Sequence, residues 1–100
     1  MKESDILQLV RRKASQLGAI VWRNNVGMLK NSQGQPVFYG LCKGSSDLIG
    51  IFKGKFLAIE TKMPGKKPTP EQQKFIDTVN KEGGIAAVIT HPDQLENILK

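Results

Sequence analysis

Residues 46–62 read SDLIGIFKGKFLAIETK, two apolar runs separated by Lys53-Gly54. A Lys-Gly pair between two such runs predicts a β-hairpin with a tight turn. With a two-residue loop, facing residues have numbers that sum alike, which places Asp47 opposite Glu60. A four-residue loop gives the same register, whereas a three-residue loop would put the two carboxylates on opposite faces.

Two carboxylates that face each other across a hairpin repel unless another group neutralises them. Directly opposed residues have Cβ atoms ~4.5–5.5 Å apart, and like charges there are destabilising. A divalent cation is the simplest neutralising group, and hard carboxylate oxygens favour Mg²⁺ or Mn²⁺. We therefore expect Asp47 and Glu60 to bind a metal ion, helped by the backbone carbonyl of Thr61, whose side chain should point away.

Lys62 lies two residues beyond Glu60 and should point to the same face of the strand. Two acids and a lysine on one face suit metal-assisted hydrolysis of a phosphodiester, in which the lysine positions water and offsets phosphate charge. An Asp–Glu pair also occurs in glycosidases. The basic surroundings favour a phosphate substrate instead.

The composition predicts one small domain over residues 1–100, with 39% hydrophobic residues and a modest core. Such a core makes a homodimer plausible. No apolar run approaches the ~20 residues that span a membrane, and Cys42 has no second cysteine to pair with. We expect a cytoplasmic, reduced protein. Neither GxGxxG nor GxxxxGK[ST] occurs, so no small-molecule cofactor is expected.

The net charge of +6 is unevenly distributed, because no acidic residue occurs from Ile6 to Ser46. Ordinary solvated surface and a phosphate-binding face are both compatible with this charge. The DNA-binding interpretation takes in seven polar or basic residues of the loops and strand ends. These are Arg23, Asn24, Lys30, Lys43, Ser45, Lys66 and Lys67.

Periodicity predicts a helix over residues 3–17, ended by Gly18, and a short buried strand over 19–22. Residues 26–40 predict a second hairpin or a strand with an arm. A helix over 70–82 and an apolar strand over 85–89 follow, and a final helix starts after His91. The hairpin, the helix and the last strand suggest a βαβ unit with parallel strands, hence an α/β or α+β domain around a mixed sheet.

Four residues have two interpretations each. Trp22 and Phe38 could stack on DNA bases, but core packing is the expectation. Glu3 leans toward the buried side of the first helical turn, where an acid is also favoured by the helix dipole alone. Gln72 completes a Thr69-x-x-Gln capping box, and it also lies on the inward face, at the helix end nearest the Glu60 strand.

Asp47 followed after twelve residues by Glu60-Thr61-Lys62 resembles the PD-(D/E)XK nuclease motif, although Ser46 stands where the superfamily name has Pro. The longer pattern resembles the VRR-NUC (virus-type replication-repair nuclease) branch of that superfamily. The matching segments follow one another over nearly the whole chain. They are Glu3, Lys43–Leu48, Ile59–Lys62, Pro64-Gly65, Thr69-x-x-Gln72-x-x-Phe75 and Gly83-Gly84.

The resemblance implies a restriction-endonuclease-like αβββαβ core and divalent-metal-dependent cleavage of DNA. It implies two carboxylate ligands, a catalytic Lys62, and Gln72 and Glu3 in the site. Small standalone members resemble Holliday-junction resolvases, which act as dimers on branched DNA. A role in phage or bacterial replication, recombination or repair follows from the same resemblance.

Two other classes of function compete with an endonuclease. A non-catalytic nucleic-acid-binding module would bind DNA in a salt-sensitive way and cleave nothing. A structural or dimeric adaptor would have a basic surface that serves no function in binding. The opposed carboxylates argue against both, because neither class has a use for them.

Overall fold

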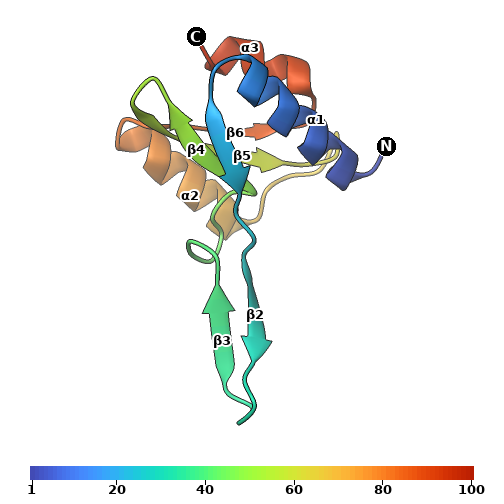
Figure 1. The fold of residues 1–100 in the computed structure, drawn as a ribbon, viewed down its shortest axis with the longest axis vertical. Helices are drawn as coiled ribbons and strands as arrows, with labels where there is room; N and C mark the ends of the chain where they lie inside the picture. The colour runs from blue at the N-terminus through green and yellow to red at the C-terminus, as the bar shows by residue number, and fades with distance from the viewer.

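Six strands and four short or medium helices make up the protein, and two of the strands form a ribbon apart from the rest (Figure 1). The computed structural model describes residues 1–100. The elements in chain order are α1 (Glu3–Gln16), β1 (Ile20–Arg23), β2 (Gly27–Lys30), β3 (Pro36–Tyr39), β4 (Leu48–Phe52), β5 (Lys55–Thr61), α2 (Pro70–Lys81), β6 (Ile85–Ile89), the 3₁₀ turn η1 (Pro92–Gln94) and α3 (Leu95–Ile98).

The central sheet has the strand order β1-β4-β5-β6. Strands β1, β4 and β5 pair antiparallel, and α2 carries the chain across to β6, which is parallel to β5. Apart from the β2–β3 ribbon, this is the predicted αβββαβ order around a mixed sheet. The α+β prediction is therefore confirmed.

The central hairpin has the predicted register. Phe52 pairs with Lys55 and Leu48 with Ile59, so one step further along the strands Asp47 faces Glu60. The turn residues Lys53-Gly54 have φ values of 50° and 79°, the doubly positive pattern that matches the twist of a two-residue hairpin.

Helices cover both faces of the sheet. On one face, α1 and the C-terminal segment pack over β4 and β5 in the main core, which includes Val10, Leu48, Leu57 and Leu95. On the other face, α2 covers only part of the sheet, where Ile76 contacts Ala58 and Ala86. Strand β5 is buried from Leu57 to Thr61, as expected for a strand covered on both sides.

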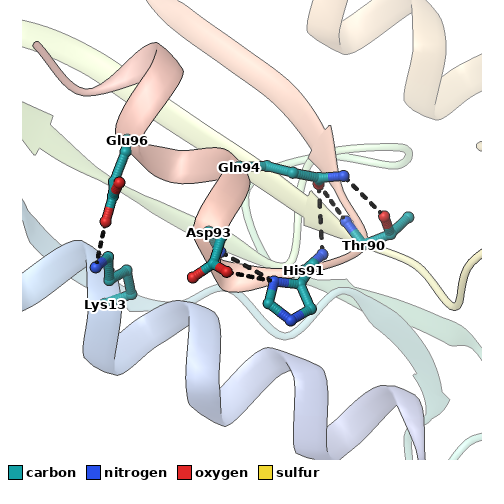
Figure 2. Close-up of polar contacts among 6 residues, drawn as sticks. All are labelled: Lys13, Thr90, His91, Asp93, Gln94 and Glu96. Carbon is teal, nitrogen blue, oxygen red and sulfur yellow. Dashed lines mark hydrogen bonds and ion pairs between the residues drawn. The ribbon is translucent and has the colours of Figure 1, made fainter.

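One ion pair joins the C-terminal segment to α1, and local hydrogen bonds shape the turn that begins that segment (Figure 2). Lys13 Nζ lies 2.6 Å from Glu96 Oε1, and this contact raises the pKa of Lys13 and lowers that of Glu96. Gln94 Oε1 accepts from the N–H of Thr90 at 2.8 Å. His91 caps η1 by accepting from the Asp93 N–H at 3.2 Å, which confirms it as a helix-start residue, although the final helix is only one turn of 3₁₀ and one of α.

The expectation that Trp22 and Phe38 pack in the core is wrong. Phe38 is 74% exposed and Trp22 44% exposed. The interior of strand 19–22 was also predicted to be buried, yet Ile20 is 65% exposed because β1 is an edge strand and α2 does not reach it. The predicted second hairpin exists as the β2–β3 ribbon, which projects from the body along the 47 Å axis of the molecule.

None of the helices combines the length and the apolar character needed to cross a bilayer.

Candidate metal and nuclease site

The carboxylate pair, Asp47 and Glu60, lies where β4 begins and β5 ends. In the register of the sheet, Asn24 on the β1 side and Val88 on the β6 side extend the same row. Glu60 is only 1% exposed, and its Oε2 atom has no hydrogen-bond partner. A buried acid with an unpartnered oxygen costs stability unless it is neutralised by a proton or a ligand.

Thr61 holds the carboxylate of Asp47. Its backbone N–H donates to Asp47 Oδ2 at 3.0 Å and its hydroxyl donates to the same oxygen at 2.9 Å. The expectation that the Thr61 side chain points away from the acids is therefore wrong. Asp47 precedes Leu48, the first residue of β4, so the alternation of side chains along a strand does not fix its direction. Its side chain instead lies against Thr61 at the end of the sheet.

The pKa of Glu60 is raised to about 8. Burial is the largest cause, followed by the negative charge of Asp47 and a hydrogen bond between the two carboxyls, while Lys62 acts in the opposite direction. The two acids are thus close enough to interact strongly, and Lys62 is within electrostatic reach of Glu60. At neutral pH the pair holds a proton that a cation can replace.

Two buried side-chain polar atoms in the chain lack a hydrogen-bond partner, Glu60 Oε2 and Ser46 Oγ. Both belong to residues at the Asp47 end of the central hairpin. No group of three or more acidic, histidine or cysteine side chains converges anywhere. The fit to a hard divalent cation rests on two carboxylates alone, one of which has an unpartnered oxygen, so carbonyl or water oxygens would have to complete its shell.

A small cavity of about 120 Å³ opens beside Asp47 and Thr61. The first turn of α1 contributes Glu3 to its lining, and the end of β1 contributes Arg23. The capping hydrogen bond of α1 is made by Asp5, whose carboxylate accepts from the Lys2 N–H at 2.8 Å. Glu3 does not make this capping hydrogen bond, and it lines the same cavity as Asp47 and Arg23.

Gln72 is not joined to the acids by any hydrogen bond. Its Oε1 accepts from the Thr69 N–H at 2.8 Å, and its own N–H donates to Thr69 Oγ1 at 3.2 Å. The capping box at the start of α2 therefore forms as predicted. The side-chain amide Nε2 takes no part in it.

Asn24 and Ser45 are buried and form a hydrogen-bond network behind Asp47. Asn24 Nδ2 donates to Ser45 Oγ at 2.7 Å and to the Ser46 carbonyl at 2.9 Å, and Asn24 Oδ1 accepts from the Leu41 N–H at 3.0 Å. The Asn24 N–H donates to the Asp47 carbonyl at 2.8 Å. The side-chain polar atoms of both residues are used inside the protein, which argues against the expectation that Asn24 and Ser45 contact DNA. They position the residues that lead into Asp47.

The remaining residues expected at DNA lie on exposed segments around the body and the ribbon. Lys30 ends β2, Lys66 and Lys67 lie in the loop before α2, and Lys43 is 4.0 Å from Glu71 Oε1. None of these four lysines lines the cavity beside Asp47, whereas Arg23, the fifth residue of this group, does.

Comparison with known proteins agrees with this geometry. Residues 1–91 match the model of the VRR-NUC domain family. The match spans most of the chain, so the fold is that of a nuclease-family domain. The protein belongs to the VRR-NUC domain family.

A solved structure described as a VRR_NUC domain superposes with a TM-score of 0.64 at 22% sequence identity, covering 95% of this chain and 90% of that chain. At this identity the superposition establishes the fold. No curated protein matches the chain.

Proposed function

We propose that the protein is a DNA endonuclease that hydrolyses phosphodiester bonds with Mg²⁺ or Mn²⁺. The observation that supports this most is the carboxylate pair, with its buried, unpartnered Glu60 oxygen and the raised pKa of Glu60. A divalent cation would neutralise both acids at once. A module that only bound DNA would carry the cost of this pair without using it.

Asp47 and Glu60 would hold the ion, with the backbone carbonyl of Thr61 as a third protein ligand. Asp47 Oδ2 accepts two hydrogen bonds from Thr61, which leaves Oδ1 as the freer oxygen. A bound Mg²⁺ or Mn²⁺ would polarise the scissile phosphate and lower the pKa of an attached water.

The neighbouring side chains would act on the water and the phosphate directly. The Lys62 ammonium would orient the attacking water and balance the charge that develops on the phosphate. Across the cavity, the carboxylate of Glu3 would accept a hydrogen bond from water and the Arg23 guanidinium would pair with a phosphate oxygen. Gln72 Nε2 would donate to the phosphate while its Oε1 keeps the helix cap.

We further propose that one domain over residues 1–100 acts as a homodimer on branched DNA, such as a Holliday junction, in phage or bacterial replication, recombination or repair. A junction presents two symmetric cleavage sites, which suits a twofold dimer. Lys30, Lys43, Lys66 and Lys67 would contact the backbone. This binding should weaken steeply with salt.

The test is to incubate the protein with single-stranded, duplex, flap and four-way-junction DNA of one sequence, with Mg²⁺, Mn²⁺ or EDTA. We expect cleavage with either metal, none with EDTA, and the highest rate on the junction. Binding without cleavage under every metal condition would overturn the proposed activity in favour of a DNA-binding module. Equal rates on all four substrates would overturn the structure selectivity alone.

A further inference from the structure

Helix α1 carries on its outer side a row of polar and basic side chains that begins at the cavity beside Asp47. Ser4 lines that cavity, and spacings of four, three and four residues place Gln8, Arg11 and Ser15 in the same row. The part of the row beyond Ser4 lines a groove of about 450 Å³. This surface, the α1 strip, consists of Ser4, Gln8, Arg11, Arg12, Ser15 and Gln16, all of them exposed.

The two guanidinium groups of the α1 strip have no counter-ion in the protein. None of the ion pairs of the chain uses Arg11 or Arg12, whereas the neighbouring Lys13 is paired with Glu96. Both acids of α1 are in its first turn, and no acid lies three or four positions from either arginine. The positive charge of the strip is therefore left to attract an anion from outside the chain.

Helix stability does not account for the two arginines. The helix dipole favours a cation in the last turn, and Lys13 is the basic residue there. The outer side of α2 shows how a solvated helix balances its charge, because Lys74 and Lys81 flank Asp77 at spacings of three and four residues. The α1 strip has no such alternation of charge.

The residue types of the α1 strip match a row of phosphates. Arg11, Arg12 and Arg23 are all the arginines of the chain, and Arg23 lines the cavity where the strip begins. A planar guanidinium binds phosphate through two parallel hydrogen bonds, which the ammonium of lysine does not provide. Serine and glutamine side chains also donate hydrogen bonds to phosphate oxygens.

We propose that the α1 strip binds the backbone of the DNA duplex next to the scissile phosphate, with Arg11 and Arg12 each on a phosphate. This inference rests on the proposed function, because it takes the phosphate at the cavity to be the one that is cleaved. At ~1.5 Å per residue, the two arginines lie ~12–14 Å along α1 from Glu3 at the cavity. At ~3.4 Å per base pair, this distance corresponds to ~4 base pairs of duplex on the side that α1 covers.

Binding of a labelled four-way junction to the full chain tests the proposal, in EDTA so that no DNA is cleaved. We expect Arg11→Gln/Arg12→Gln to weaken binding by about tenfold or more, and to make the slope of log K against log salt shallower by ~1.8, the value for two lost phosphate contacts. Glutamine keeps the helix propensity of arginine, and circular dichroism would verify the fold.

The matched control is Lys74→Gln/Lys81→Gln on the outer side of α2, which removes the same charge from another helix. At about 0.1 M salt, exposed charges more than ~10 Å apart are largely screened, so the affinity of this variant should change by less than about twofold. An equal loss in the two variants would show that only the net charge matters, and would overturn the proposal.

Uncharged methylphosphonate linkages in the DNA locate the contact. They are placed about three to five nucleotides from the mapped cleavage position, on one side at a time. On the side that α1 covers, they should weaken binding of the wild type and leave the arginine variant unchanged, because its contacts are already lost. Equal weakening of both proteins on each side would contradict the proposal.

Cleavage by the arginine variant at saturating DNA should be as fast as that of the wild type, with a raised KM, because the strip does not touch the reacting atoms. A wild type that cleaves nothing with any metal would refute the proposed activity, while binding in EDTA would still decide whether the strip binds DNA. Unchanged DNA affinity of the arginine variant would overturn the proposal. If this variant instead loses affinity for polyglutamate alone, the strip binds an acidic protein.

Discussion

The carboxylate pair and the arm, which is the β2–β3 ribbon with its flanking residues 26–41, show opposite mismatches between side chains and their surroundings. At the carboxylate pair, charged oxygens are buried and one of them has no partner. On the arm, large apolar side chains are exposed on both faces. Each region lowers the free energy of unfolding of the isolated chain relative to a chain in which the same side chains are paired or buried. The comparison teaches that a small domain can present two mismatches of opposite chemistry, buried charge that calls for a neutralising group and exposed apolar surface that calls for a covering one.

The largest expected effect comes from Lys62→Ala at the carboxylate pair. Loss of a group that orients water and balances phosphate charge should lower the cleavage rate by about 10²–10⁴-fold. Lys55→Ala, at the exposed start of the same strand, is the control and should cleave normally. Full metal-dependent cleavage by Lys62→Ala would remove this residue from the mechanism.

Glu60→Gln should remove the pH dependence that the buried acid imposes on stability. The native pKa of about 8 lies above the ordinary 4.5, so the free protein holds the proton more tightly than the unfolded chain does. Its stabilising effect is complete below pH 4.5 and is lost as the pH rises through about 8.

At ~1.4 kcal/mol per pKa unit, the metal-free wild type should lose a few kcal/mol across this range. Denaturant unfolding in EDTA at pH 5, 7 and 9 measures it. Glu60→Gln should flatten the curve, whereas Glu82→Gln at an exposed position should not. A wild-type stability that stays constant from pH 5 to 9 would show that Glu60 is not buried in its acid form.

Asn24→Ala should reduce stability by ~2–3 kcal/mol, because several buried groups lose their hydrogen-bond partners. Asn24 lies between the base of the arm and the Asp47 backbone, so cleavage should fall as well, through misplacement of Asp47. The neighbouring, exposed Asn25→Ala is the control and should change stability by less than ~0.5 kcal/mol. Equal stability of the two variants would show that the network has no energetic role.

The smallest expected effect is at the arm in the absence of self-association. Phe38→Thr should change the unfolding free energy of dilute, monomeric protein by less than ~0.5 kcal/mol, because the side chain is 74% exposed. Leu57→Ala in the core should cost ~2–5 kcal/mol under the same conditions. A large loss for Phe38→Thr in the monomer would mean that the arm contributes to the fold of one chain.

Local rules predicted the register of the central hairpin and the start of α2. The turn residues Lys53-Gly54 determine which residues face each other, and the capping box marks a helix start wherever it occurs. Both depend on residues close in sequence. The fold class and the facing acids could be predicted for this reason.

The exposure of Trp22 and Phe38 could not be predicted, because apolar residues in a strand indicate a preference for burial without indicating what covers them. The network of Asn24 with Ser45 joins residues 21 positions apart and depends on how the loop folds back. The hydrogen bond from the Thr61 hydroxyl to Asp47 could not be predicted either. Asp47 lies one residue before β4, where the alternation of side chains along a strand no longer determines which way a side chain points.

The most direct test of the central claim is calorimetric titration of Mn²⁺ into metal-free protein at pH 7, in two buffers of different ionisation heat. If Asp47 and Glu60 share a cation, the wild type should bind Mn²⁺ and release close to one proton, because Glu60 is largely protonated before binding. Asp47→Asn should lose most of this affinity, and Asp77→Asn on the exposed face of α2 should keep it. Equal affinity of Asp47→Asn and wild type, or binding without proton release, would contradict the account.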